Sequence, residues 1–173
     1  MRPSWEEYFV QVMDAVALRG SCDRGRSGAV IVKDKRILAT GYVGAPSGLP
    51  TCEDEGHEYV RKNEISVKSK EGDWIYDERG CFIIKSYNYS LHCIRTVHAE
   101  LNAILNCARN GVPTVGATIY CTMTPCPNCA MAIIQAGIIE VVAKNLYQKG
   151  DKSIKMFEQV GIKYKTLNEQ LLY

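Results

Sequence analysis

A histidine, a glutamate and two cysteines form the clearest chemical pattern in the chain. His98 and Glu100 make a His-x-Glu pair, and Cys126 and Cys129 make a Cys-x-x-Cys pair with a proline before its first cysteine. Two thiolates at the start of a helix meet the positive end of the helix dipole, and an imidazole that opens another helix adds a nitrogen donor. Three ligands of these types fit Zn²⁺ and leave its fourth tetrahedral position to water, whose pKa the metal lowers from 15.7 to about 7. The pattern predicts a catalytic zinc site held by His98, Cys126 and Cys129.

Glu100 lies only two residues after His98, so its carboxylate cannot easily join the same tetrahedron. A carboxylate beside a metal-activated water is a proton carrier, and this is the role that we expect for Glu100. Taken alone, the Cys-x-x-Cys pair also fits a redox pair or half of a structural zinc site. Cys121 is a candidate for a fourth structural ligand, but it lies in a strand-like pattern and is expected in the core. The preceding His-x-Glu pair favours the catalytic site over both alternatives.

The composition limits the classes of protein to which the chain can belong. Its 173 residues are 46% hydrophobic, which suits a single globular domain with a sizeable core. No apolar run approaches the roughly 20 residues that cross a bilayer, and no apolar signal core follows Met1, so we expect a cytoplasmic protein. The net charge of +2 argues against broad capture of nucleic acid. Eight cysteines without a signal segment favour metal binding over a disulfide framework.

Helical and strand-like patterns alternate along most of the chain. Ser4 and Glu7 form a capping box that begins a helix, which Gly20 ends. Strand-like runs at 28–33 and 36–42 are joined in a hairpin by Asp34 and Lys35. Later in the chain the pattern predicts helices at 98–110, 127–136 and 152–160 and strands at 117–122, 138–143 and 162–165. This order predicts a three-layer α/β/α fold with a mixed central sheet, in one domain over residues 1–173.

A polar insertion at about residues 58–91 interrupts this alternation. Within it, weak strand-like pieces around 74–76 and 81–84 indicate a small hairpin. A connection of this length usually needs a function or an anchoring ligand.

The chemical motifs and their surroundings resemble a known family. Residues 96–104 read Thr-Val-His-Ala-Glu-Leu-Asn-Ala-Ile, and residues 122–130 read Thr-Met-Thr-Pro-Cys-Pro-Asn-Cys-Ala. With the runs at 28–32, 41–48 and 134–138, they resemble deoxycytidylate (dCMP) deaminases of the zinc-dependent cytidine and deoxycytidylate deaminase superfamily, whose signature joins His-x-Glu to Pro-Cys-x-x-Cys. The resemblance extends from Trp5 to about Ile162, apart from the insertion. We therefore expect a fold of the cytidine-deaminase type.

The resemblance implies hydrolytic deamination of dCMP to dUMP and ammonia, which supplies dUMP for thymidylate synthesis. Activated water attacks C4 of the cytosine, and Glu100 passes a proton to the ring nitrogen. The implied substrate-binding residues are Arg24, Arg26, Asn102, Thr124 and Tyr147. Asn102 lies one helical turn after His98 and shares its face, and arginine matches the geometry of phosphate. Alternatively, Asn102 and the two arginines are ordinary solvent-exposed side chains without a role in binding.

Many dCMP deaminases are hexamers that dCTP activates and dTTP inhibits, each with Mg²⁺, and the resemblance implies the same here. Tyr42 and Gly44 lie beside or in the loop that resembles the effector-binding region, and Arg109 resembles a residue near the subunit interface. Val43 takes the place of an asparagine that is usual in the family, so we expect altered recognition of sugar, phosphate or effector. Whether dCTP is an additional substrate stays open.

A second, structural zinc is also suggested by the resemblance. Its expected ligands are Cys22, Cys52, His92 and Cys93. Such an ion would join the two segments that flank the insertion, although buried free cysteines are also common in cores. Structural roles are expected for His57, Cys81 and Cys107.

Two other functions compete with nucleotide deamination. A deaminase that acts on tRNA or single-stranded nucleic acid shares the same core motifs, but it should carry a basic face. A non-catalytic zinc-binding module is expected to lose its glutamate, whereas Glu100 is present. Both alternatives remain, but deamination of dCMP accounts for more of the motifs than either of them.

Overall fold

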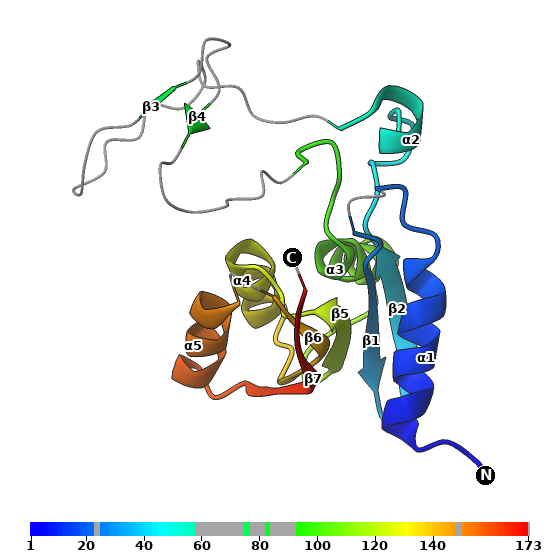
Figure 1. Cartoon of the computed structure of the whole chain (residues 1–173). Coiled ribbons are helices and arrows are strands. Elements are labelled where there is room, and N and C mark those ends of the chain that lie inside the picture. Colours follow the sequence, from blue (N-terminus) through cyan, green and yellow to red (C-terminus); the bar gives the residue numbers. More distant parts are fainter. Residues whose placement is uncertain (23–24, 58–74, 77–81, 84–92, 148–149, 173) are drawn as a thin grey trace.

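The computed structural model describes residues 1–22, 25–57, 75–76, 82–83, 93–147 and 150–172. Its centre is a five-stranded sheet with the strand order β2-β1-β5-β6-β7 (Figure 1). The strands are β1 (Gly28–Lys33), β2 (Arg36–Tyr42), β5 (Thr118–Met123), β6 (Glu140–Tyr147) and β7 (Lys163–Leu172). β1 runs antiparallel to β2 and β5, whereas β5, β6 and β7 run parallel. The predicted mixed sheet is confirmed.

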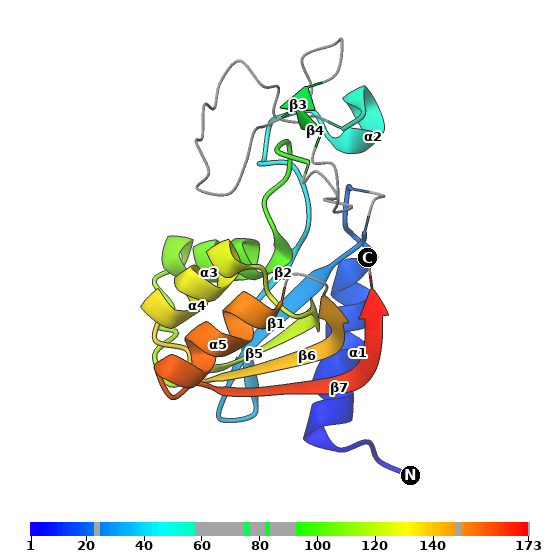
Figure 2. The same ribbon diagram turned by 60° about the vertical axis from the view of Figure 1, so that its left-hand side comes forward.

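Helices cover both faces of this sheet (Figure 2). α1 (Trp5–Ala17) lies on one face, where Phe9 and Met13 pack with Val30 and Tyr120. The other face carries α3 (Ala99–Arg109), α4 (Pro127–Gln135) and α5 (Asp151–Gln159), which enclose the larger part of the core. The three-layer α/β/α architecture is confirmed. Within the described ranges, every helix is too short or too polar to cross a bilayer.

Local signals explain where several elements begin, turn and end. The Ser4 hydroxyl accepts from the Glu7 amide, and the Glu7 carboxylate accepts from the Ser4 amide, so the predicted capping box holds the first turn of α1. The β1–β2 turn places Asp34 and Lys35 at φ angles of 50° and 59°, which a tight hairpin between twisted strands requires. β7 extends beyond the predicted strand at 162–165 and pairs with β6 along its length. The extension was not predicted because the second half of this edge strand has no alternating apolar pattern.

The described part of the insertion contains the expected hairpin. β3 (Ile75–Tyr76) pairs antiparallel with β4 (Phe82–Ile83), and most of the predicted insertion at 58–91 lies outside the described residues. Just before the insertion is α2 (Cys52–Glu55), a single turn that the sequence analysis missed. Its capping box is formed by Thr51 and Asp54. A capping box, the signal that correctly predicted the start of α1, therefore also marks the start of α2.

Two close approaches position the start of α3. Gly41 of β2 lies so close to α3 that a Cβ atom there would collide with the backbone of Ala99 and Ala103. Gly44 and Val97 form an antiparallel bridge, with both of their amides donating to the partner's carbonyl. The end of β2 is thereby tied to the residue before His98.

Candidate metal centres

The predicted catalytic residues meet at the N-termini of α3 and α4. His98 is the N-cap of α3, Cys126 is the N-cap of α4, and Cys129 lies in the first turn of α4. His98 Nδ1 lies 3.5 Å from Cys126 Sγ and 3.4 Å from Cys129 Sγ. All three ligand atoms lie within 4.8 Å of one another. The structure thus brings together the three residues that the sequence predicted as ligands.

These separations fit one zinc ion. In a tetrahedron with Zn–N and Zn–S bonds of about 2.05 and 2.3 Å, nitrogen and sulfur ligands lie about 3.6 Å apart. The observed N···S distances of 3.5 and 3.4 Å are close to that value. Two thiols and an imidazole are donors that zinc prefers, and three protein ligands leave one coordination position open. Cys121 is buried in the main core, as predicted.

The electrostatics of the site favour a thiolate. A hydrogen bond from Cys129, helped by His98 and opposed by burial, lowers the pKa of Cys126 to about 3. The same contact with Cys126 raises the pKa of the Cys129 thiol, so the two thiols share a proton. A hydrogen bond with Cys126 also raises the pKa of His98. A divalent cation replaces such protons, because zinc ligands are thiolates and neutral imidazoles.

Glu100 lies in the first turn of α3 and is only 7% exposed. Its Oε2 accepts a hydrogen bond from Cys129 Sγ at 3.6 Å, while Glu100 itself is outside the group of three ligands. Burial is the main cause that raises the pKa of its carboxyl group. A buried carboxyl group beside the ligands is placed to take up and return a proton.

Three of the predicted substrate-binding residues lie on elements around this site. Thr124 is buried just before the Cys-x-x-Cys pair, and Tyr147 is half-buried at the end of β6. Asn102 Nδ2 donates to the Tyr42 backbone carbonyl at 2.7 Å. Asn102 therefore ties α3 to the end of β2, one helical turn after His98. This contact was not predicted.

Of the predicted phosphate-binding and effector residues, Arg26, Arg109 and Tyr42 are exposed. Arg26 is exposed, with a guanidinium nitrogen 3.8 Å from the Glu53 carboxylate, and Arg24 lies outside the described residues. Arg109 is exposed in the last turn of α3. Tyr42 is 41% exposed, and a Cβ atom on Gly44 would lie 3.2 Å from its ring. An exposed ion pair as long as that of Arg26 is weak, so the guanidinium can exchange it for an anion.

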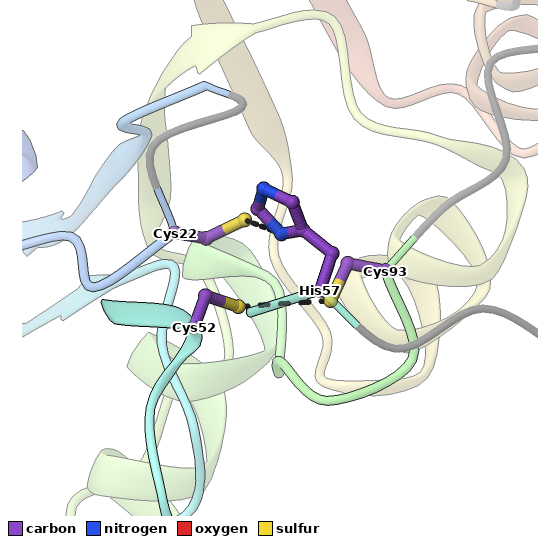
Figure 3. A group of neighbouring side chains, drawn as sticks. All are labelled: Cys22, Cys52, His57 and Cys93. Carbon is purple, nitrogen blue, oxygen red and sulfur yellow. Dashed lines mark hydrogen bonds between the residues drawn. The ribbon is translucent and has the colours of Figure 1, made fainter. Parts of the chain in front are cut away.

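A second group of metal-binding side chains lies between the segments that flank the insertion (Figure 3). It consists of Cys22, Cys52, His57 and Cys93, whose ligand atoms all lie within 4.8 Å of one another. Cys52 Sγ lies 3.6 Å from Cys93 Sγ, and Cys22 Sγ lies 3.8 Å from His57 Nδ1. In a tetrahedral zinc site the S···S and N···S separations are about 3.8 and 3.6 Å. The donor set and its spacing therefore fit a zinc ion.

His57 is the fourth donor in this group, where the sequence analysis expected His92. His92 lies outside the described residues, and His57, for which a structural role was expected, lies beside the three thiols. The single turn of α2 explains why His57 reaches the thiols. The turn begins at Cys52 and is capped by Gly56, whose φ angle of 76° reverses the chain. The capping box of α2 and the Cys52-x₄-His57 spacing were the signals that could have indicated this pairing.

The three cysteines of this group are buried together with Val43. Burial, together with the neighbouring Cys93 and Cys22 thiols, raises the pKa of Cys52 to about 12. The three cysteines are not linked to one another by a disulfide. Val43 contributes an apolar wall to the cluster.

Comparisons with known proteins agree with this geometry. Residues 3–145 match the family model described as the cytidine and deoxycytidylate deaminase zinc-binding region. ComE operon protein 2 of Bacillus subtilis is 40% identical over 161 residues, which are 93% of this chain and 70% of that relative. The deoxycytidylate deaminase of Mycobacterium phage D29 is 36% identical over 141 residues, which are 82% of this chain and 94% of the phage protein.

A solved structure extends the likeness to the fold. The dCMP deaminase of the cyanophage S-TIM5, crystallised in complex with dCMP and dUMP, superimposes with a TM-score of 0.68 at 26% identity. The match covers 96% of this chain and 98% of the cyanophage chain. The expected cytidine-deaminase-like fold is confirmed. The family-model match, the phage relative and this superposition together show that the chain belongs to the cytidine and deoxycytidylate deaminase family.

Proposed function

We propose that this chain hydrolyses dCMP to dUMP and ammonia at a zinc site held by His98, Cys126 and Cys129. The observation behind the proposal is a buried carboxyl, Glu100, directly beside that group of ligands. The name of the phage D29 relative and the dCMP and dUMP in the cyanophage structure support the choice of substrate. In the reaction one water is consumed, a C4–O bond forms, and the bond from C4 to the exocyclic amine breaks.

Zinc at this site supplies Lewis-acid activation of water near neutral pH. Glu100 accepts the proton that the attacking water loses and delivers it to N3 of the cytosine ring. Glu100 then takes the second proton from the hydroxyl now on C4 and passes it to the exocyclic amine, so that ammonia leaves and the C4 carbonyl of dUMP forms. Because burial raises the pKa of Glu100, its carboxyl group is suited to both steps.

Other side chains orient the nucleotide in this proposal. The backbone carbonyl of Thr124 accepts a hydrogen bond from the departing amine. Asn102 is held by its bond to Tyr42 and presents an amide oxygen that can accept from a sugar hydroxyl. The phosphate is bound by Arg24, Arg26 and Tyr147.

The test compares ammonia release from dCMP, dCTP, deoxycytidine and CMP, with a tRNA and a single-stranded oligodeoxynucleotide as further arms. Selective turnover of dCMP that disappears in Glu100→Ala supports the proposal. Turnover of nucleic acid in place of dCMP overturns the substrate assignment. A protein that binds zinc and deaminates none of these substrates is a non-catalytic module.

We further propose that Cys22, Cys52, His57 and Cys93 bind a structural zinc. The support is a complete Cys₃His donor set whose spacing matches a tetrahedral ion and whose cysteines are buried without forming a disulfide. Four protein ligands close the coordination sphere, as in structural sites. The ion would join the chain before β1, α2 and the segment that leads to His98.

Zinc analysis of purified variants tests this second site. We expect two zinc ions per wild-type chain and one per chain in Cys52→Ala. Cys107→Ala is the matched control, since Cys107 is equally buried but lies in the main core away from both groups. One zinc ion per wild-type chain would contradict the proposal.

We also propose that the enzyme is a cytoplasmic hexamer, activated by dCTP and inhibited by dTTP, each with Mg²⁺. This proposal rests on the resemblance of the loop after Tyr42 and of Arg109 to family residues. Sedimentation gives the mass of the assembly, and turnover of dCMP with each triphosphate gives the response. A monomer, or a rate that neither triphosphate changes, would overturn the corresponding part.

A further inference from the structure

Thr124 lies in a loop, but it is buried and both its amide and its hydroxyl form hydrogen bonds. It lies between the end of β5 and the start of α4, two residues before Cys126, and is only 2% exposed. Its amide donates to the Asn145 carbonyl of β6 at 2.9 Å, and its hydroxyl donates to the same carbonyl at 3.4 Å. The position of Thr124 is therefore coupled to β6.

Tyr164 of β7 makes the remaining contact with the Thr124 hydroxyl. The two oxygens are 2.9 Å apart. Either hydroxyl can be the donor in this bond. The Tyr164 ring stacks on the buried ring of Phe157, with 6.1 Å between the ring centroids and 16° between their planes. The phenol therefore reaches Thr124 from a fixed support.

Gly150, just before α5, closes a third side of Thr124. A Cβ atom at Gly150 would lie 2.7 Å from Thr124 Cγ2. The φ angle of Gly150 is −74°, so the glycine is needed for space and not for its backbone conformation. Three segments distant in sequence thus converge on one side chain beside the metal ligands.

We propose that Tyr164 is a positioning residue for the deamination, acting through Thr124. The hydrogen bond fixes the turn from Thr124 to Cys126, and with it the Thr124 carbonyl that receives the departing amine. The contacts of Tyr164 that carry the proposal are those with Thr124 and Phe157. The inference rests on the proposed function, because it assigns Tyr164 a part in that same reaction.

The test compares Tyr164→Phe, which removes only the hydroxyl, with Tyr120→Phe as a matched control on the opposite face of the sheet. We expect kcat to fall about fivefold in Tyr164→Phe, the effect of one hydrogen bond, with KM unchanged. Hydrogen exchange of the Thr124 amide is expected to become faster in the same variant. Tyr120→Phe should change neither kcat nor this exchange.

A double-mutant cycle with Thr124→Val decides whether the effect passes through Thr124. Tyr164→Phe should have no further effect on kcat in the Thr124→Val background. Independent effects of the two changes, an unchanged kcat in Tyr164→Phe, or a lower kcat without faster exchange would each overturn the inference. Wild-type turnover of dCMP tests the proposed function separately. If another cytosine nucleotide is the true substrate, the same ratios are measured on that nucleotide.

Discussion

Glu100 is the residue whose environment most directly determines the chemistry. Its place two residues after the N-cap of α3 puts the carboxyl beside the ligands, and the surrounding core excludes water from it. Loss of hydration raises the pKa of the carboxyl group, which favours a group that carries a proton over one that stays ionised. Glu100 is thus placed to transfer a proton, whereas His98 and the two cysteines are placed to bind the metal.

Glu100→Gln keeps the size of the side chain and removes its ability to exchange a proton. We expect kcat to fall by about 10² to 10⁴, the usual contribution of a general acid–base group, with zinc content unchanged. Glu158→Gln, an exposed position on α5, is the control. Ammonia release and zinc analysis on the same samples check this prediction. Wild-type turnover in Glu100→Gln would contradict the role.

Among single residues, the sequence predicted the metal ligands that belong to short motifs. His98, Cys126 and Cys129 were identified from their types and spacing, because a ligand at a helix start has a defined direction. The partner of Asn102 was not predictable, because the Tyr42 carbonyl becomes its neighbour only when β2 packs on α3. His57 was missed for the same reason, since its approach to Cys22 depends on the turn after α2.

Helix ends are the elements on which both metal-binding groups depend. The ligands of the first group lie at the starts of α3 and α4, and α2 has Cys52 as its first residue and His57 just beyond its end. Capping boxes predicted α1 but were overlooked at α2, where the acidic partner is Asp54 in place of the usual glutamate. Strand ends were less predictable, as β7 shows, because an edge strand can be polar.

The capping box of α1 gives its stability a specific pH dependence. The Ser4 amide donates to the Glu7 carboxylate and lowers the pKa of Glu7, with help from the Ser4 hydroxyl. A lowered folded-state pKa adds stability above the unfolded pKa, and this stability is lost as pH falls through the folded value. Glu7→Ala should therefore lower the Tm at neutral pH, with a difference that shrinks on acidification. An identical Glu7→Ala effect at all pH values would contradict the explanation.

The contact between β2 and α3 should tolerate no side chain at Gly41. A Cβ atom there would meet the α3 backbone, which cannot move aside without displacing His98 and Glu100. Gly41→Ala should cost about 1–3 kcal/mol or more in the free energy of unfolding. Urea denaturation measures this cost. Gly25→Ala is the control, because a Cβ atom at Gly25 would meet no neighbour within 4 Å in the described part of the chain. Equal stability of the two variants would contradict the argument.

For the whole molecule, the strand order explains why distant segments meet at one site. The order β2-β1-β5-β6-β7 places β5 at the centre of the sheet, while α3 packs on β1 and β2 and lies beside α4. The sequence predicted the alternation of elements, the three layers and a mixed sheet. It did not give the strand order or the convergence of β6, β7 and α5 on Thr124, because these depend on tertiary packing and not on local pattern.

Metal removal should affect the whole molecule as well as catalysis. The second group joins three separate segments, so its zinc should stabilise the fold by binding only the folded chain. Chelation should lower the Tm by about 10 °C, and addition of zinc should restore it. Chelator already saturated with zinc is the control. Cys52→Ala should show a smaller Tm shift on chelation than wild type, and an equal shift would contradict the role of the second group.

The most direct test of the central claim is to incubate zinc-loaded protein with dCMP in water enriched in oxygen-18. The account predicts dUMP with one labelled oxygen at C4 and an equal amount of ammonia, both absent with Glu100→Gln. Release of ammonia without label at C4, or no dUMP from protein that holds its zinc, would contradict hydrolytic deamination of dCMP by this chain.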